Sequence, residues 1–488
     1  MGDSSIEVNR GQGEMGEMPR KQEVDWGGMA PAVEGAAAPV TPVVEEMGVP
    51  AVDRGVGVVF TRERLRVWGW RSAVSLVDQG LTAGAGFGVN LLLARWIAAE
   101  AYGAFAVAFA GFLFVSGFHN VLLLEPMTVM GPSRHAGRLP GYFRAQMKVH
   151  LILVGPLSAA TLLAGAILWS RGPGSALAEA VVGAGLSLPF LLLAWLVRRM
   201  CYVVQRPGVA VVGSGTYLAV VAAGLFLLGR YGWLGPFTAF ALMGGGSAVA
   251  AGLLLWRLGL LKRGIGREEG VSWGRALGEN WTYGRWLVGS TVLFSISSQT
   301  QMFLVAGMLG LGAAGILRAM QIPSLVMTQV VFAAGLVVLP SFSIDFGKGS
   351  VQRLRHKVTL VSMGLGAGTL CFAGGLALIS SSTERLLFAG KYSTYALLMP
   401  ILALVPTAIG FSTGHSMAMR ATQKPRFDLV ANAIAAPVGV ISAIFFIRWW
   451  GITGAAASMA VGFAAYAISV CCIYWFPGET ERKRGLFN

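Results

Sequence analysis

Long apolar stretches dominate the chain from about residue 72 onward, and short polar segments separate them. A run of about 20 apolar residues spans a hydrocarbon layer of ~30 Å as a helix. The pattern therefore predicts an all-α polytopic membrane protein with twelve transmembrane helices. They cover residues 72–94, 102–123, 149–169, 176–197, 209–229, 236–258, 286–308, 314–340, 358–380, 393–416, 428–447 and 452–475.

Composition agrees with a membrane protein, because hydrophobic residues make up 55% of the chain and charged residues only 12%. The net charge of +15 raises the question of nucleic-acid binding. However, most of the 38 Lys and Arg residues lie in the connections on one side of the twelve predicted helices. This segregation is typical of cytoplasmic loops and of contact with anionic membrane lipids. It predicts cytoplasmic N- and C-termini and leaves no basic patch for nucleic acid.

The segments between and beyond these helices suggest five regions. The linker contains Trp273, Leu277 and Trp281 on one helical face, which is typical of an amphipathic helix in the membrane interface. An ordinary linker helix between two bundles fits this pattern equally well. The predicted regions are a disordered acidic cytoplasmic tail (1–60), an N-terminal six-helix bundle (61–258), the cytoplasmic linker (259–285), a C-terminal six-helix bundle (286–476) and a basic cytoplasmic tail (477–488).

A weak internal repeat relates the two bundles. A shift of 212 residues places 91–105 on 303–317 and pairs Gly103 with Gly315. Six helices per half is an even number, so both halves enter the membrane in the same sense. This predicts two pseudo-symmetric six-helix bundles related by an axis along the membrane normal, with a transport site between them.

Polar residues recur along one face of the first predicted helix, at Ser75, Asp78, Gln79, Thr82, Gly86 and Asn90. Such a face points toward protein or water rather than lipid. Asp78 is the only acidic residue that we place in the interior of a predicted span. We expect Asp78 and Gln79 to serve in ion coupling or gating. Hydrogen bonding between helices without a transport role remains an open alternative for both.

One basic residue, Arg318, lies inside a predicted span. A charge at bilayer depth is costly and suggests function. Gly315 and Ala319 share its helical face, so another helix or a ligand can approach there. A side chain that extends outward to the lipid headgroups is the alternative. The predicted substrate-binding residues are Arg318, Gln321, Gln299, Gln301 and Asn90.

Signatures of catalysis are missing from the sequence. It contains neither a GxxxxGK[ST] loop nor an HExxH motif, and its five histidines are scattered. The four cysteines fall in or beside predicted helices, where they act as small hydrophobic residues. We therefore expect no enzyme activity, no catalytic residues, no metal site and no cofactor.

Three segments resemble a known family: "SLVDQGLTAGAGFGVNLLLARWIAAEAYGAFAVAF" (75–109), "LLLEPMTVMG" (122–131) and "GAAGILRAMQIP" (312–323). They are similar to the Wzx-like polysaccharide and O-antigen flippases of the multidrug/oligosaccharidyl-lipid/polysaccharide exporter (MOP) superfamily. The resemblance covers residues 61–476, and the long acidic tail departs from the short N-terminus usual in that family.

The resemblance implies a transporter of the bacterial inner membrane that turns a polyprenyl-diphosphate-linked oligosaccharide from the cytoplasmic to the outer leaflet. It also implies alternating access of the two bundles, contact with membrane lipids and, as further partners, other polysaccharide-assembly membrane proteins. A cation-coupled multidrug exporter of the same superfamily is the alternative, with Asp78 as its ion site. A noncatalytic membrane scaffold and a membrane-integral glycan-modifying enzyme are weaker alternatives, since catalytic clusters are missing and the outer loops are short.

Overall fold

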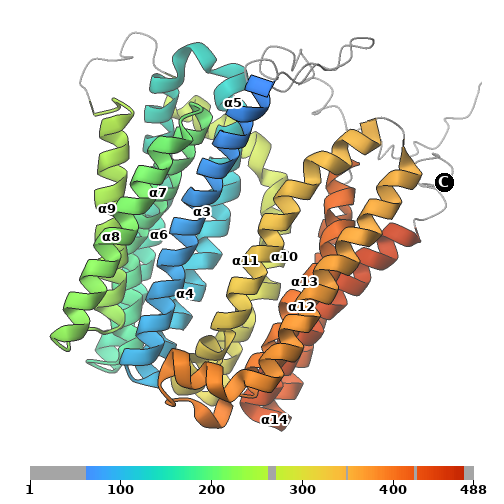
Figure 1. Ribbon diagram of the computed structural model, residues 1–488. Helices are drawn as coiled ribbons and strands as arrows, with labels where there is room; N and C mark the ends of the chain where they lie inside the picture. Colours follow the sequence, from blue (N-terminus) through green and yellow to red (C-terminus); the bar gives the residue numbers. More distant parts are fainter. Residues whose placement is uncertain (1–61, 262–270, 348–349, 423–425, 477–488) are drawn as a thin grey trace, which may run out of the picture. The chain divides into compact units, whose positions relative to one another are not determined.

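The computed structural model describes residues 62–261, 271–347, 350–422 and 426–476, and these residues form helices and connections without any strand (Figure 1). The predicted tails at 1–60 and 477–488 lie outside this part. The major helices are α3 (Arg62–Trp96), α4 (Ala99–His119), α5 (Glu125–Arg134), α6 (Leu139–Arg171), α7 (Ala176–Val203), α8 (Pro207–Arg230), α9 (Pro236–Arg257), α10 (Trp273–Leu309), α11 (Leu311–Gly347), α12 (Val351–Phe388), α13 (Leu398–Ala421) and α14 (Arg426–Trp475).

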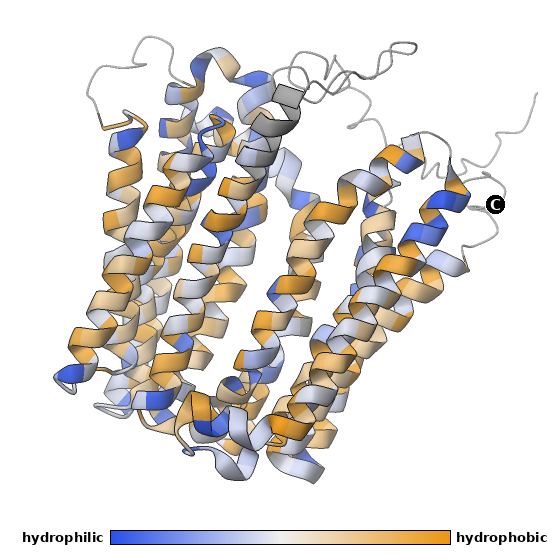
Figure 2. Ribbon diagram, viewed as in Figure 1, coloured by the Kyte–Doolittle hydropathy of each residue, from blue (hydrophilic) through white to orange (hydrophobic). Residues whose placement is uncertain are grey.

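Ten helical stretches in the described residues are long and apolar enough to cross a membrane. Two features account for the difference between this number and the predicted twelve. The first is α3, whose 35 residues suffice to cross but whose polar stripe makes it less apolar. The second is α14, which is interrupted at Gly451. Figure 2 shows hydrophobic residues along the middle of the helices and hydrophilic ones toward their ends. The predicted all-α polytopic fold is confirmed.

Gly451 turns α14 into a hairpin of two helical segments. Its φ of 58° is a left-handed conformation that glycine adopts without steric cost. The two segments then pack closely, because a Cβ atom on Gly462 would lie only 3.1 Å from Cα of Gly439. Glycine at 462 therefore favours this close packing, whereas a Cβ atom on Gly439 would meet Cα of Gly462 at an ordinary contact distance of 3.6 Å.

The helix bounds repeat along the chain. Adding 212 to the bounds of α3 gives 274–308, and α10 spans Trp273–Leu309. The same shift moves the stretch from α4 to α5 (99–134) onto 311–346, and α11 spans Leu311–Gly347. The start of α6 moves onto the start of α12, Val351. The helices thus support the repeat that the sequence suggested.

The amphipathic segment predicted as a linker is the first part of α10 rather than a separate helix. Residues 262–270 of the predicted linker lie outside the described part of the chain. From Trp273 onward, however, no proline interrupts the helix before Leu309, so it continues into the span. Trp273 and Trp281 are exposed, whereas Ala276 is fully buried against the first half.

A π-helical turn, η2 (Asn120–Leu124), joins α4 to α5. Asn120 Nδ2 donates a hydrogen bond of 2.9 Å to Glu125 Oε1 across this turn. Residues five apart lie on different faces of an α-helix but approach each other in a π-turn. The wide turn therefore brings this pair together.

Candidate functional site

Arg318 lies at the contact between the two halves of the chain, where α11 packs against α3 and α4. Its Nε donates to Oδ1 of Asn90 on α3 at 3.4 Å, and its Nη1 donates to Oε1 of Gln321 at 3.4 Å. Its Cζ lies 5.9 Å from the ring centroid of Phe109 on α4. The side chain is partly buried and points toward protein, not outward to headgroups. The structure thus brings together three of the five residues predicted to bind substrate.

Close helix packing explains this placement of Arg318. A Cβ atom on Gly315 would lie 2.1 Å from the carbonyl oxygen of Ala99 at the start of α4. Ala319 is also fully buried on the same helical face. Because residues three or four apart share a face, Arg318 is directed into the contact with α3 and α4.

The polar partners of Arg318 are neutral and only loosely bound. Its hydrogen bonds to Asn90 and Gln321 are both longer than the usual 2.7–3.2 Å range. The acceptors are amide oxygens, and Oδ1 of Asn90 also accepts a hydrogen bond from the Tyr102 hydroxyl at 3.2 Å. No ion pair joins Arg318 to an acidic residue in the part of the chain that the structure describes. The site therefore presents a positive charge with donors available to an anion.

Asp78 lies in a separate cluster within the first half, at the contact of α3 with α7 and α8. The side chain is fully buried. Its Oδ2 accepts hydrogen bonds from Arg198 Nε at 2.8 Å and from the Tyr202 hydroxyl, and its Oδ1 accepts one from Ser214 Oγ at 2.5 Å. Arg198 Nη2 completes an ion pair at 2.7 Å. Unlike the charge of Arg318, the charge of Asp78 is compensated.

The other three predicted site residues lie elsewhere. Gln79 is exposed, outside the buried Asp78 cluster. Gln299 donates to Ser298 on its own helix at 3.3 Å. Gln301 is buried where α10 packs against α14, and its Oε1 has no hydrogen-bond partner among the described residues. No hydrogen bond joins Gln299 or Gln301 to Arg318 within the described residues.

Several residues of these clusters were not predicted from the sequence. Tyr102 and Phe109 lie seven residues apart, which is two helical turns, so they share one face of α4. This spacing could have predicted that both belong to the same site. Arg198 was assigned to a cytoplasmic connection because the predicted span ended at 197, but α7 continues to Val203. Its pairing with Asp78 is a contact between distant segments that no local pattern reveals.

A second contact between the halves lies at the predicted outer end, at the bottom of Figure 1. Lys391 Nζ, in the α12–α13 connection, donates to the carbonyl of Ala94 at 2.9 Å and also to that of Ile97. The Tyr392 hydroxyl donates to the same Ala94 oxygen at 2.9 Å. Carbonyls at a helix C-terminus lack intrahelical partners and favour cations. Burial lowers the pKa of Lys391 below its ordinary value.

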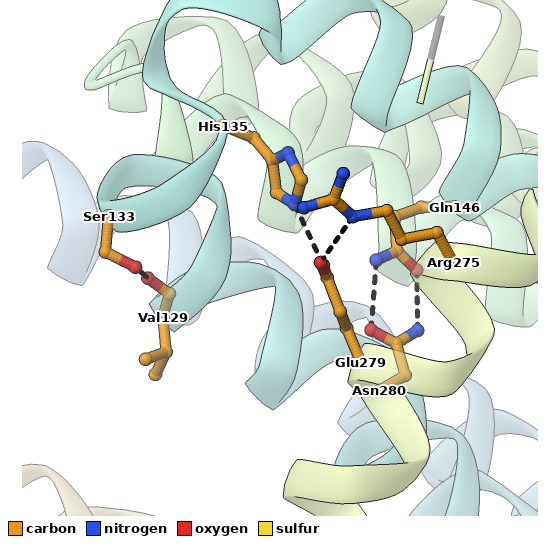
Figure 3. Close-up of polar contacts among 7 residues, drawn as sticks. All are labelled: Val129, Ser133, His135, Gln146, Arg275, Glu279 and Asn280. Carbon is orange, nitrogen blue, oxygen red and sulfur yellow. Dashed lines mark hydrogen bonds and ion pairs between the residues drawn. The ribbon is translucent and has the colours of Figure 1, made fainter. Parts of the chain in front are cut away.

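A third contact, toward the predicted cytoplasmic end, fixes the start of α10 against the first half (Figure 3). Glu279 accepts from His135 Nε2 at 2.9 Å and from Arg275 Nε at 3.1 Å. At the next residue of α10, Asn280 exchanges two hydrogen bonds of 3.1 and 2.8 Å with Gln146. Burial by itself would raise the pKa of Glu279, but the hydrogen bonds and charges of His135 and Arg275 lower it below its ordinary value.

No group of three or more His, Cys, Asp or Glu side chains suited to a metal ion occurs among the residues that the structure describes. The chemistry available at Arg318 is instead binding chemistry, namely a guanidinium, two amides, a phenol and an aromatic ring.

Comparison by sequence finds no matching family model and no matching curated protein. Comparison of structures finds an inward-facing multidrug resistance MATE family transporter of the MOP superfamily (TM-score 0.71, 12% identity, covering 84% of this chain and 98% of that one). The lipid II flippase MurJ in an inward closed conformation is also similar (TM-score 0.65, 13% identity, covering 82% of this chain and 86% of that one). The structure is also similar to a MOP superfamily transporter from Pyrococcus furiosus, which is described as having a binding pocket of reverse polarity (TM-score 0.60, 12% identity, covering 86% of this chain and 95% of that one). The described part of this chain therefore has the fold of the MOP superfamily transporters.

Proposed function

We propose that this protein is a flippase that turns a polyprenyl-diphosphate-linked oligosaccharide from the cytoplasmic to the outer leaflet of a bacterial inner membrane, with both termini in the cytoplasm. The observation that carries the proposal is the charge of Arg318. It lies at the contact between the halves and has only neutral partners among the described residues. A charge in such surroundings is costly unless a ligand of opposite charge compensates it.

The groups around Arg318 match this class of substrate. A guanidinium presents a planar fork of donors that binds phosphate in a bidentate manner. The amides of Asn90 and Gln321 and the Tyr102 hydroxyl suit the hydroxyl groups of a sugar. The lipid tail can remain in the bilayer, where it needs no polar partner. Gln299 and Gln301 on α10 would extend the polar lining as the halves move.

The fold supports transport by alternating access of two halves. Its neighbours include a lipid II flippase and a multidrug transporter, so the fold alone favours neither substrate. The distinction rests on charge. A cation-coupled drug exporter needs an acidic residue available to a cation, and the Asp78 carboxylate is already bound to Arg198, Tyr202 and Ser214. Arg318 would in addition repel a cationic drug.

Ion coupling is a separate part of the proposal and falls to Asp78 with its neighbour Gln79. The membrane potential also favours outward movement of an anion in an inside-negative cell. Two charges carried across the whole field gain roughly 4–5 kcal/mol per 100 mV.

Reconstitution into liposomes tests the substrate class. Vesicles carry a polyprenyl-diphosphate oligosaccharide in their membrane, and a lectin added outside reports the sugar that reaches the outer leaflet. We expect flipping by the wild-type protein and its loss in Arg318→Ala, with no uptake of ethidium by either. Ethidium transport that survives Arg318→Ala, without any flipping, would favour the drug exporter instead.

A further inference from the structure

Two hollows lie along one face of the second segment of α14, away from the Arg318 cluster. The first has a volume of about 560 Å³ and opens between the start of α12 and Trp475. The second, of about 350 Å³, lies between α13 and α14 and is lined by apolar residues and two cysteines. Both volumes fall in the range of small-molecule sites. We call them the basic hollow and the apolar groove.

The basic hollow is lined by Arg353, Arg355 and His356 together with three uncharged residues. The neighbouring cation Lys357 is not available, because its Nζ forms an ion pair with Asp345 at 2.5 Å and a hydrogen bond with Ser341 at 3.0 Å. No acidic side chain lines the hollow. Its charge is therefore suited to an anion.

Arg355 gives a more specific indication of a ligand. Its Nε is buried yet has no hydrogen-bond partner among the described residues. A buried donor without a partner costs about 1–3 kcal/mol, and such groups commonly mark a missing ligand or water. The donor belongs to a residue that lines the hollow.

Trp475 forms one wall of the basic hollow and lies one helical turn beyond Cys471 of the apolar groove. Its Nε1 donates to Nε2 of His415 at 3.1 Å, so the indole is held in place and its ring, rather than its N–H, faces the hollow. Aromatic rings of this kind favour the boundary between headgroups and hydrocarbon. Trp475 therefore marks where a polar ligand group would end and an apolar one begin.

The apolar groove continues from this wall along the same helical face. Ala464, Ile468, Cys471 and Trp475 recur at intervals of three or four residues, which places them in one row along α14. Phe411 of α13 lines the opposite side. Ile468 is 63% exposed, so the groove opens to the surface of the protein.

We propose that these two hollows form one binding site for an anionic glycerophospholipid of the surrounding bilayer. The phosphate would bind Arg353 and Arg355 in the basic hollow, and one acyl chain would lie in the apolar groove. Charge complementarity selects an anionic headgroup, and an apolar groove next to it selects a lipid over free phosphate. This site is independent of the transport proposed for Arg318, because it lies on α12, α13 and α14 alone.

Native mass spectrometry of the purified full-length protein tests the proposal, with phosphatidylglycerol and phosphatidylcholine of identical acyl chains as probes. We expect wild type to bind several-fold more phosphatidylglycerol, and the Arg353→Gln/Arg355→Gln variant to bind both lipids equally. Arg134→Gln, an exposed basic residue at the same predicted membrane face, should behave as wild type. Equal binding by wild type, or an unchanged preference in the double variant, would overturn the proposal.

Three further measurements separate the parts of the site. If the double variant elutes as an aggregate, the single variant Arg353→Gln replaces it, because this side chain is exposed and its loss leaves the packing intact. An unchanged preference of that variant for phosphatidylglycerol would count against the site. Millimolar inorganic phosphate should not displace the lipid, and displacement would assign the hollow to free phosphate. Cys472→Phe fills the exposed groove and should lower lipid binding several-fold; unchanged binding would exclude the groove.

Discussion

Gly103 on α4 and Gly315 on α11 meet backbone to backbone, since a Cβ atom built on either would lie 2.9 Å from the amide nitrogen of the other. These are the two residues that the 212-residue repeat pairs. Equivalent positions of two pseudo-symmetric halves touch each other only near the axis that relates the halves. This contact therefore lies near the predicted axis that relates the two halves.

Alanine at these glycines should weaken the contact between the halves. The new Cβ would meet the carbonyl oxygen of Leu311 at 1.7 Å for Gly103→Ala, and that of Ala99 at 2.1 Å for Gly315→Ala. Backbone cannot yield as a flexible side chain does, so we expect destabilisation of about 1–3 kcal/mol. Thermal unfolding in detergent measures the loss. Gly111→Ala and Gly312→Ala are matched controls, because a Cβ meets nothing within 4 Å there; equal loss in all four would refute the packing argument.

Substitution of Arg318 should reduce transport, and the reduction should depend on how many hydrogen-bond donors the new side chain keeps. Arg318→Lys keeps the charge but loses the fork of donors, whereas Arg318→Ala loses both. We expect reduced flipping in the lysine variant and a reduction of about tenfold or more in the alanine variant, since a hydrogen bond to a charged group contributes about 1.5–3 kcal/mol. Arg171→Ala, an exposed arginine at the opposite end of α6 from the cytoplasmic loops, controls for expression and insertion. Full activity of Arg318→Ala would contradict the binding role.

The buried pair of Asp78 and Arg198 should show strong coupling in a double-mutant cycle. Removing one partner leaves the other charge uncompensated, and we expect Asp78→Asn to cost about 3–5 kcal/mol of stability. Arg198→Gln should cost less, because the Arg198 side chain is 25% exposed. The double variant should recover part of the loss.

The coupling role of Asp78 needs a separate readout. The pH dependence of flipping in the Asp78→Asn variant, compared with wild type at equal protein level, provides it. If the pH profile is unchanged, Asp78 is a structural residue of the first half and has no role in ion coupling.

Acid should release the start of α10 from the first half. The pKa of Glu279 is lowered in the folded protein, so its contribution to stability is complete above the ordinary carboxyl value and is lost as the pH falls through the lowered one. Hydrogen exchange at 273–285 should therefore accelerate under acid. In Glu279→Gln, residues 273–285 should exchange fast at every pH. In Gln146→Leu, their exchange should still accelerate under acid, because the hydrogen bond that this substitution removes does not titrate. An acid step retained in Glu279→Gln would assign the titration to another group.

The predicted topology can be tested by cysteine labelling in a background without the native cysteines, two of which, Cys371 and Cys472, are exposed. Ser170→Cys and Ser393→Cys should react from outside intact cells, and Ser133→Cys only after the membrane is opened. Labelling of position 170 or 393 only from the inside would reverse the orientation. It would also require a different direction of transport.

Local pattern was sufficient for much of the fold. Apolar runs of the right length located the long helices, and the gap between the runs ending at 447 and starting at 452 coincides with the break at Gly451. Gly315 and Ala319 also indicated the direction of the Arg318 side chain. Small residues on one helical face allow a neighbouring helix to pack there, and Arg318 shares that face.

The features that the sequence did not predict depend on contacts between segments far apart in the chain. Asp78 binds Arg198, 120 residues away, and a charge near the end of a helix looks the same in sequence whether it lies in a loop or inside the bundle. The start of α10 was misjudged for a related reason, since its exposed tryptophans resemble those of a surface helix while Glu279 and Asn280 hold it to the first half.

The π-turn at Asn120–Leu124 sets the rotational register of the helix that follows it. One residue more than an α-helical turn is accommodated there, so the residues beyond it escape the rotation of about 100° that an extra residue imposes in a continuous α-helix. The face of α5 that contacts α7 and α10 thus depends on the width of the turn upstream of it. Closing this turn to α-helical width without removing a residue would direct a different row of α5 side chains toward both neighbours, whereas deleting one residue from it would restore an ordinary helix and leave the same row in contact.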